Sequence, residues 1–309
     1  MKSGNVEKAG IIYVAFGYEY LLMAAYSAYT ARKRNPGIVT SVITNLKINN
    51  KDILKDYFDN IFYENLKNEL NRFVKTRVID YAPFIKGAFL DCDTEVLGDL
   101  SPVLACLDRF DVILKLTPRP SIKDYRISKE VKGNEFPMWN SGVIFFRNGG
   151  PARKLFSDWG KYFLEMGKKS DQPALARTIF ENPDIRVLSV NYMWNTFPSD
   201  LMLIKQGQKS PCRIWHYRNP HDFPDVAKKI FRQHQTVLKS IDLKDSSIKN
   251  EIKKIEQKYR ILCSFYYRNR FLRPFYLRYL KTISKLGFGP RPALSRTKHR
   301  AGNKYETSG

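Results

Sequence analysis

Residues 11–43 read IIYVAFGYEYLLMAAYSAYTARKRNPGIVTSVI, and the architecture of the chain follows from this segment. It opens with six consecutive apolar residues, 11–16, which is typical of a strand buried on both faces of a sheet. Apolar residues at helical spacing follow in 21–34, up to the stop signal Asn35-Pro36-Gly37. A second β-branched run occupies 38–43. Strand, helix and strand in this order predict a βαβ unit and therefore a parallel sheet.

The alternation of strands and helices continues to about residue 215. We expect further strands at 60–63, 86–90, 110–116, 141–146 and 212–215, and helices at 65–81, 100–107, 151–166 and 171–180. The segment 117–138 is long and polar, so it is expected to form a binding loop or a lid. The sequence thus predicts an α/β domain over residues 1–235, with a parallel sheet flanked by helices.

The chain changes character after about residue 235. Residues 240–260 predict a charged helix, and 261–286 mix aromatic residues with Lys and Arg. The last segment, 287–309, has little apolar content and is predicted to be disordered. We therefore expect residues 236–309 to form a basic, aromatic-rich helical tail.

The net charge is unusual. The chain has 53 Lys and Arg against 30 Asp and Glu, which gives +23 at pH 7. About half of it comes from Gln257 to Gly309, where thirteen Lys or Arg accompany one acid, Glu306. Such an excess favours nucleic acid, an anionic membrane or phosphorylated small molecules as partners.

The sequence also bears on the compartment. Its four cysteines, Cys92, Cys106, Cys212 and Cys263, are widely spaced, which favours a reducing compartment over a disulfide framework. Residues 1–10 are polar, and every apolar run is too short to span a membrane. We therefore expect a cytoplasmic protein.

The most informative motif is AFLDCDTEV, residues 88–96, where an apolar strand ends in Asp91-Cys92-Asp93. In an open α/β sheet, ligands gather beyond the carboxyl ends of the strands. Two aspartates at that position can bind a hard divalent cation, Mn²⁺ or Mg²⁺, which in turn holds a diphosphate. Taken alone, such a pair is more often a solvated turn.

Other blocks change that balance. They are, in chain order, Arg77, Leu90-Asp91-Cys92-Asp93, Trp139-Asn140-Ser141-Gly142-Val143, Asp171-Gln172 and Ile214-Trp215-His216-Tyr217. In this order and at this spacing, over residues 11–220, the chain resembles the retaining glycosyltransferases of family 8. The resemblance implies the GT-A fold of that family, a Rossmann-like, mixed but mostly parallel sheet flanked by helices. Members of the family include glycogenin and bacterial lipopolysaccharide galactosyl- and glucosyltransferases.

The resemblance implies a metal site and a donor site. Asp91, Asp93 and His216 would hold Mn²⁺ or Mg²⁺, although His216 taken alone is equally well a packed or surface histidine. A second group of residues would contact the nucleotide-sugar donor: Arg77, Asn140, Ser141 and Asp171, with Gln172 near the anomeric carbon. Asp171-Gln172 also suits the start of a helix, and Ser141-Gly142 suits a strand that begins after a turn.

The resemblance also indicates where the nucleotide would lie. The exit of the first strand is where this family holds the nucleobase, so Tyr18 or Tyr20 is predicted to stack on it, with core packing as the alternative. Asn45 is a weaker candidate for a base or ribose contact. The chain departs from the family after His216, where Arg218 stands in place of a glycine and lysine block; we expect Arg218 to supply the positive charge for the diphosphate.

The predicted function is metal-dependent, retaining transfer of a hexose from a nucleotide sugar, a UDP-sugar first of all, to a glycan or glycolipid, as in lipopolysaccharide or capsule assembly. A nucleic-acid-binding protein is the alternative suggested by the charge of +23. It leaves the acidic blocks without a role, because acids repel phosphates, so no nucleic-acid partner is expected. A metal-dependent nucleotidyltransferase would normally show a glycine-rich phosphate loop, and a folded but inactive module would not keep the whole metal set.

The tail adds a prediction about location. Aromatic and basic residues interleave from Tyr259 to Leu286, a composition typical of segments that lie in the interface of anionic bilayers. We expect the tail to attach the protein to the inner face of the cell membrane, near a lipid-linked acceptor. The alternative is a helix that packs on the catalytic domain.

Overall fold

The structure is a computed structural model that describes residues 9–67, 70–117, 127–128, 131, 135–167, 170–200, 212–217 and 224–268. Contacts divide the chain into two units, residues 1–259 and 260–309. Nearly all described residues belong to the first unit. The predicted boundary after residue 235 lies inside a helix of that unit.

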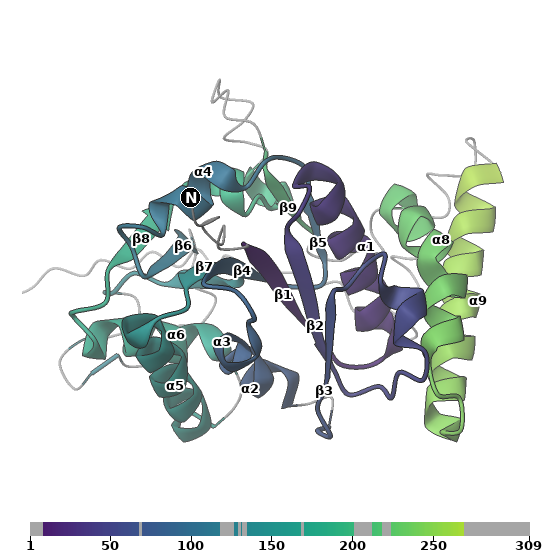
Figure 1. Cartoon of the computed structure of the whole chain (residues 1–309), viewed down its shortest axis with the longest axis horizontal. Helices are drawn as coiled ribbons and strands as arrows, with labels where there is room; N and C mark the ends of the chain where they lie inside the picture. Colours follow the sequence, from purple (N-terminus) through teal and green to yellow (C-terminus); the bar gives the residue numbers. More distant parts are fainter. Residues whose placement is uncertain are drawn as a thin grey trace, which may run out of the picture. The chain divides into compact units, whose positions relative to one another are not determined.

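A seven-stranded sheet with the order β3-β2-β1-β4-β7-β6-β8 forms the centre of the first unit (Figure 1). Its strands are β1 Gly10–Ala15, β2 Val39–Thr44, β3 Asn60–Tyr63, β4 Lys86–Leu90, β6 Val112–Leu116, β7 Trp139–Arg147 and β8 Val187–Val190. All neighbouring strands run parallel except β7, which is antiparallel to both β4 and β6. The predicted mixed, mostly parallel α/β sheet is confirmed. A separate two-stranded sheet pairs β5 Thr94–Val96 with β9 Ile214–His216.

Helices cover both faces of the large sheet. They are α1 Tyr18–Arg34, α2 Asn71–Lys75, α3 Val78–Tyr81, α4 Ser101–Cys106, α5 Gly150–Glu165, α6 Asp171–Glu181, α8 Pro224–Ser240 and α9 Ser246–Arg268, with short 3-10 helices η1 Lys51–Leu54, η3 Tyr192–Trp194 and η4 Pro198–Asp200. Helix α1 packs on β1 and β2, and α8 packs on α1, whereas α2 and α3 contact β1, and α6 contacts β7. No helix in the described part of the chain is long and apolar enough to cross a membrane.

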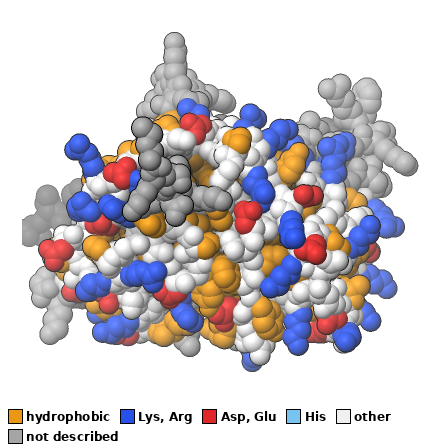
Figure 2. Space-filling model, in the orientation of Figure 1, with side chains coloured by type: hydrophobic (Ala, Val, Ile, Leu, Met, Phe, Trp, Pro, Cys, Tyr) orange, Lys and Arg blue, Asp and Glu red, His pale blue; other side chains and the backbone are white. Residues whose placement is uncertain are grey.

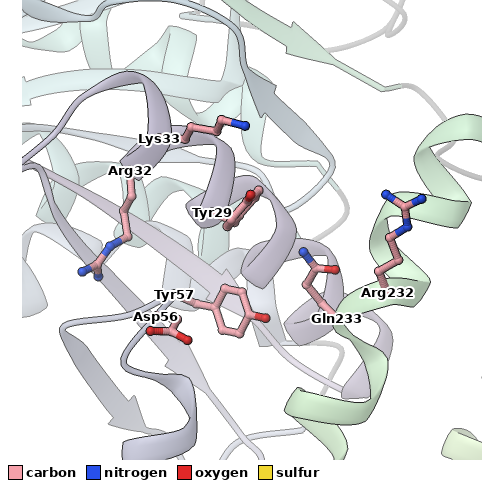
Figure 3. A pocket seen from close by; sticks show the side chains of 7 residues that line it. All are labelled: Tyr29, Arg32, Lys33, Asp56, Tyr57, Arg232 and Gln233. Atoms are coloured by element: carbon pink, nitrogen blue, oxygen red, sulfur yellow. The ribbon is translucent and has the colours of Figure 1, made fainter.

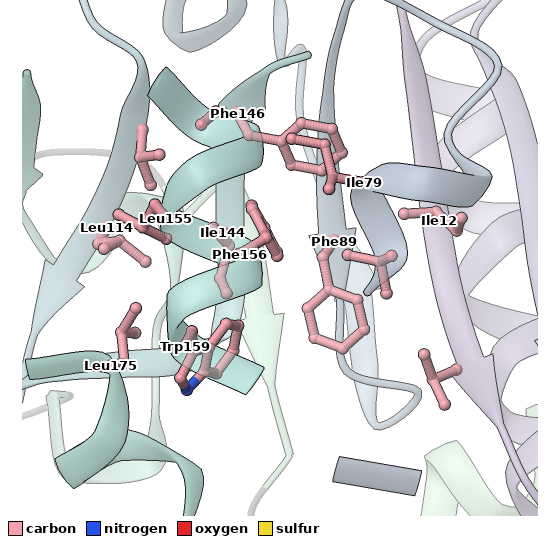
Figure 4. Packing of buried hydrophobic residues seen from close by; sticks show 14 of the residues in the cluster. Ile12, Ile79, Phe89, Leu114, Ile144, Phe146, Leu155, Phe156, Trp159 and Leu175 are labelled. Carbon is pink, nitrogen blue, oxygen red and sulfur yellow. The ribbon is translucent and has the colours of Figure 1, made fainter. Parts of the chain in front are cut away.

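Strand β1 shows why the apolar run predicted a doubly buried strand. Alternate side chains point to opposite faces of a sheet, so Ile12 and Val14 join one core while Tyr13 faces α1, where its hydroxyl lies 3.2 Å from Ser27 Oγ. The main core holds large side chains of α5 such as Phe156 and Trp159 (Figure 4). Fully burying aromatic rings of this kind gives the domain much of its apolar stabilisation.

Four parts of the chain differ from the sequence prediction. The single helix expected over 65–81 is two short helices, α2 and α3, separated at Thr76 and Arg77. Strands β5 and β8 are too short to give a period-2 pattern, and they were not predicted. Helix α8 was also not predicted, and the charged helix expected over 240–260 overlaps α9, which begins at Ser246.

Because β7 runs antiparallel to β4, residues distant in the sequence come together at the carboxyl end of β4. The carboxyl end of β4 pairs with the amino end of β7, with Leu90 opposite Val143. The residues just after β4 and those at the start of β7 therefore lie side by side. Asp91 begins this contact directly, because its backbone N–H donates to the Gly142 carbonyl at 2.7 Å.

The edge strand β8 depends on a buried carboxylate. Asp111 accepts hydrogen bonds from the Arg186 backbone N–H at 3.0 Å, from its Nε at 3.1 Å and from its Nη2 at 2.8 Å. These bonds with Arg186 lower the pKa of Asp111. Replacing Asp111 with Ala is expected to lower the free energy of unfolding by about 2 kcal/mol at pH 7, because it removes charge-assisted hydrogen bonds at a buried site.

Urea unfolding of the Asp111→Ala variant, with Asp108→Ala as the control, measures this effect. Asp108 is exposed and pairs only with Lys86, so its loss should change the midpoint far less. Because folding lowers the pKa of Asp111, its contribution is present above its unfolded pKa of about 3.9 and is lost as the pH falls below it. A difference from wild type that stayed constant down to pH 2 would contradict this assignment.

Candidate active site

The aspartate pair after β4 is held by backbone contacts on both sides. Asp91 is fixed to β7 through Gly142, and its own carbonyl accepts from Thr94 Oγ1 at 2.8 Å. The Asp93 carbonyl accepts the backbone N–H of Tyr217 at 2.8 Å. Both carboxylates keep a part of their surface open, 35% for Asp91 and 26% for Asp93, so a ligand can reach them.

The small sheet carries the third member of the group. In the antiparallel register of β5 and β9, Thr94 pairs with His216. This register places the imidazole beside the two aspartates, with Nε2 3.2 Å from Asp93 Oδ1 and 3.8 Å from Asp91 Oδ2. Ligand atoms of the three residues all lie within 4.8 Å of one another.

This donor set suits a divalent cation. Two carboxylate oxygens and one imidazole nitrogen are the ligands that Mn²⁺ accepts, and the carboxylates also suit Mg²⁺. Gly142 leaves the room for this arrangement, because a Cβ at that position would lie 2.3 Å from His216 Cε1 and 2.6 Å from Asp91 Oδ2. The residues present therefore fit a metal centre.

A chain of two amides orients His216. Its Nδ1 lies 3.0 Å from Asn195 Oδ1, and Asn195 Nδ2 donates to Asn140 Oδ1 at 2.8 Å. Asn140 Oδ1 also accepts the Gly142 N–H at 2.9 Å. With the amide oxygen of Asn195 facing Nδ1, a proton on that nitrogen would leave the Nε2 lone pair available to a cation beside the aspartates. Asn195 was not predicted, because no sequence pattern marks the segment that carries it.

The segment behind His216 is itself built around a buried ion pair. The Phe197 ring stacks on the imidazole with centroids 4.4 Å apart, and Lys115 Nζ lies 5.0 Å from the Phe197 ring centroid. Lys115 also pairs with the buried Asp200 carboxylate and donates to the Asn195 carbonyl at 2.9 Å. The Phe197 ring and the Asn195 amide, which Lys115 supports, together restrict the His216 imidazole to one orientation.

A buried lysine links the aspartate pair to helix α6. Lys75 Nζ lies 3.1 Å from Asp91 Oδ1, 3.2 Å from Asp171 Oδ2 and 3.2 Å from Ser141 Oγ. The Ser141 hydroxyl in turn donates to Asp171 Oδ2 at 2.8 Å. The sequence prediction missed Lys75, because a single helix over 65–81 gives no reason to choose it over the neighbouring cations.

The charges in this cluster shift one another's pKa values. Burial by itself lowers the pKa of Lys75, but Asp171 and Asp91 outweigh burial and raise it, so the ammonium stays charged. Burial also raises the pKa of Asp91, and Lys75 and His216 only partly offset this. For Asp171 the Lys75 charge and the Ser141 hydroxyl outweigh burial, and its pKa is lowered. The site thus holds more carboxylates than Lys75 alone can compensate, which favours an added cation.

The structure brings most of the predicted site residues together. Asp91, Asp93, Asn140, Ser141, Asp171 and His216 are joined by the contacts above, and Gln172 is half-buried beside Asp171 in the first turn of α6. Asp171 thus opens a helix, as the alternative reading expected, and also faces the cluster. Arg218 lies outside the described residues.

One predicted donor contact is corrected. The Tyr18 side chain is fully buried beneath α8, where its hydroxyl lies 2.6 Å from His234 Nδ1, so it cannot stack on a nucleobase. The Arg77 side chain is 45% exposed and lies 3.9 Å from Asp80, and its contact with the donor stays a prediction. The cation that reaches the aspartates is Lys75.

Tyr20 and Asn45 have different surroundings from Tyr18. Tyr20 is 48% exposed, and partial burial together with nearby acidic groups, Asp93 among them, raises the pKa of its hydroxyl. The Asn45 amide oxygen accepts the Gly17 N–H at 2.8 Å. Gly17 has a φ of 84°, which only glycine adopts readily, so Asn45 stabilises the turn from β1 into α1.

Comparison with solved structures identifies the fold. The galactosyltransferase LgtC, solved in complex with donor and acceptor sugar analogs, superposes with a TM-score of 0.52 at 15% identity, over 78% of this chain and 99% of LgtC. The glycosyltransferase GlyE of Streptococcus pneumoniae gives 0.52 at 12% identity, over 82% of this chain and 64% of GlyE. This chain has the GT-A glycosyltransferase fold.

A third GT-A structure is also similar. The bifunctional glycosyltransferase WbbM gives a TM-score of 0.51 at 12% identity, over 78% of this chain and 53% of WbbM. No family profile and no curated protein matches the sequence. The likeness to these GT-A proteins is therefore one of backbone architecture.

Removing the amide behind His216 tests the orientation described above. The Asn195→Ala variant is expected to bind Mn²⁺ about 10- to 100-fold more weakly, because the imidazole loses the partner that fixes its tautomer and direction. Isothermal titration calorimetry measures the affinity. Asn191→Ala is the matched control, since Asn191 caps η3 in the same segment without touching His216. Equal losses in both variants would mean that only the stability of the segment matters.

A methyl group at Gly142 tests the room at the metal centre. Gly142→Ala is expected to displace His216 and Asp91 and to weaken Mn²⁺ binding at least about tenfold, since ligand geometry sets metal affinity. Gly150→Ala is the control, because a Cβ there meets no atom within 4 Å. Retained affinity in Gly142→Ala, with an unchanged melting temperature, would contradict the proposed ligand set.

Proposed function

We propose that this protein is a metal-dependent, retaining glycosyltransferase similar to family 8, which transfers a hexose from a nucleotide sugar. The observation that carries the proposal is that Asp91, Asp93 and His216 lie together beyond the carboxyl end of strand β4 in a GT-A sheet. These three residues would hold a divalent cation, which would supply positive charge to the diphosphate of the donor. Mn²⁺ suits the mixed oxygen and nitrogen ligands, and Mg²⁺ is the alternative.

The protein's own residues have separate roles in this proposal. Lys75 holds Asp91 and Asp171 in place and adds positive charge beside the donor. Asn140 and Asp171 contact the donor sugar, and Gln172 lies on the face of the anomeric carbon opposite the leaving group. Ser141 supports both by fixing Asp171. The exposed ring of Tyr20, the other tyrosine predicted to stack on the nucleobase, provides that surface.

The reaction is a front-face substitution with retained configuration. The bond from the anomeric carbon to the diphosphate oxygen breaks, and the acceptor hydroxyl attacks from the same side. Its proton passes to the departing phosphate. Preorganised charge, rather than a covalent intermediate, lowers the barrier. Arg218, outside the described residues, is proposed to add charge to the diphosphate.

The acceptor is proposed to be a glycan or a lipid-linked glycan at the inner face of the cell membrane. Residues 269–309 lie outside the described part of the chain, so this proposal rests on their composition. Each Lys or Arg near an anionic leaflet contributes about 1 kcal/mol of binding free energy, and the tail holds many of them. Vesicle binding by the full chain and by a chain ending at Gln257 tests this attachment.

A thermal-shift panel tests the proposed donor class. UDP-glucose, UDP-galactose, UDP-N-acetylglucosamine and GDP-mannose are compared with and without Mn²⁺. At about 100 times its Kd, the true donor should raise the melting temperature by about 5–10 °C, and only when the metal is present. Proton NMR of the product then reports whether the anomeric configuration is retained.

The Asp91→Asn variant separates the proposed metal site from nonspecific binding. It is expected to lose both the Mn²⁺-dependent shift and sugar transfer, because it removes a ligand and a compensating charge. Asp52→Asn, at an exposed carboxylate of η1, is the matched control and should behave as wild type. Full transfer activity in Asp91→Asn would refute the proposed function.

A further inference from the structure

Two neighbouring hollows lie between α1 and α8, and none of the residues assigned to the active site lines them. The larger has a volume of about 730 Å³ and the smaller about 390 Å³. They share Tyr29, Lys33, Arg232 and Gln233, so they form one continuous depression, which we call the α1–α8 groove. Figure 3 shows the larger hollow, lined by side chains from α1, from the segment after η1 and from α8.

The groove is positively charged. Five basic side chains line it, against two carboxylates: Arg32, Lys33, Arg34, Lys229 and Arg232, with Asp56 and Glu95. Figure 2 also shows Lys and Arg side chains on the surface over α8. A recessed surface with this excess attracts anions.

Part of this charge is already compensated and part is not. Arg32 pairs with Asp59 at 3.2 Å, and Lys229 lies 3.4 Å from Glu95. The other Glu95 oxygen accepts from the Tyr217 hydroxyl. Among the residues that the structure describes, Lys33, Arg34 and Arg232 have no carboxylate within 4.0 Å. These three cations remain available to an anionic ligand.

The groove also has features that a simple charged surface does not need. The Gln233 Oε1 atom is buried and accepts no hydrogen bond, and Figure 3 shows its carboxamide projecting from α8 toward Tyr57. A buried acceptor without a donor is costly, and a ligand hydroxyl would satisfy it. Tyr29, 42% exposed, and the ring of Tyr57 offer apolar surface beside the cations.

From these observations we propose that the α1–α8 groove binds an anionic saccharide, a sugar that carries a phosphate or carboxylate group. The anionic group lies between Lys33 and Arg232, a sugar hydroxyl donates to Gln233 Oε1, and the ring packs against Tyr29. A lipid headgroup held in the plane of a bilayer would meet the exposed cations, whereas Gln233 Oε1 is buried within the groove, where a free sugar enters more readily than a headgroup anchored in a membrane. The saccharide therefore accounts for more of the groove than a membrane does.

Calorimetric titration tests the ligand class directly. Glucose 6-phosphate and tetragalacturonate represent the phosphate and carboxylate forms, and maltotetraose and inorganic phosphate are the neutral and sugar-free comparisons. Saturable 1:1 binding of at least one anionic sugar, tighter than that of maltotetraose or phosphate, is expected. Equal affinity for inorganic phosphate would overturn the assignment to a saccharide.

Charge-matched variants locate the site. The double variant Lys33→Ala/Arg232→Ala should weaken binding at least about tenfold, since it removes two charge-assisted contacts. Lys253→Ala/Lys254→Ala removes the same charge from exposed positions of α9 and should leave the affinity unchanged. Equal weakening by both double variants would show nonspecific electrostatic attraction and overturn the proposal.

Three further measurements separate a saccharide site in the α1–α8 groove from an anion site, from the active site and from a membrane contact. Gln233→Leu should weaken binding of the anionic sugar but not of inorganic phosphate. Asp91→Asn should bind it as wild type does, so the groove and the proposed transfer reaction fail independently. Phosphatidylglycerol vesicles should bind the Lys33→Ala/Arg232→Ala variant as well as wild type; loss of vesicle binding in that variant alone would identify the groove as a membrane contact and overturn the proposal.

Discussion

Repulsion among three carboxylates is the constraint around which this site is organised. Asp91 lies near both Asp93 and Asp171 just after strand β4, where burial makes the negative charge of Asp91 more costly. Lys75 compensates part of this charge from beneath, by contacting Asp91 and Asp171 at once. A divalent cation between Asp91, Asp93 and His216 would compensate the rest. A cation at this position would therefore stabilise the site.

The topology of the sheet explains how these groups meet. Strand β7 runs against its neighbours, so its first residues lie beside the residues that follow β4. The small β5–β9 sheet then brings His216 to the same place from far along the chain. Asp91, Asp93 and His216 each lie at or next to the end of a strand rather than in a long loop. Rigid elements hold a constellation of this kind more accurately than loops do.

Helix α8 has two consequences for the other side of the domain. It buries Tyr18 through the His234 contact, which removes that ring from any ligand surface. It also forms one wall of the α1–α8 groove, through Arg232 and Gln233. Its buried apolar residues Val226, Ile230 and Val237 recur at helical spacing, so the sequence does carry a helix signal here, although the helix was not predicted. Its packing on α1 was visible only in the structure.

The sequence alone determined the α/β class, most strand positions and the aspartate pair, because these depend on local patterns: long apolar runs, stop signals and an acidic motif at a strand end. The tertiary structure decided which neighbouring side chains face the site. Lys75 reaches Asp91 and Asp171 while Arg77 lies at the surface beside Asp80, and the local sequence does not show which of these cations faces the site. Asn195 likewise acquires its contact with His216 only when two segments meet, and no local pattern records such a contact.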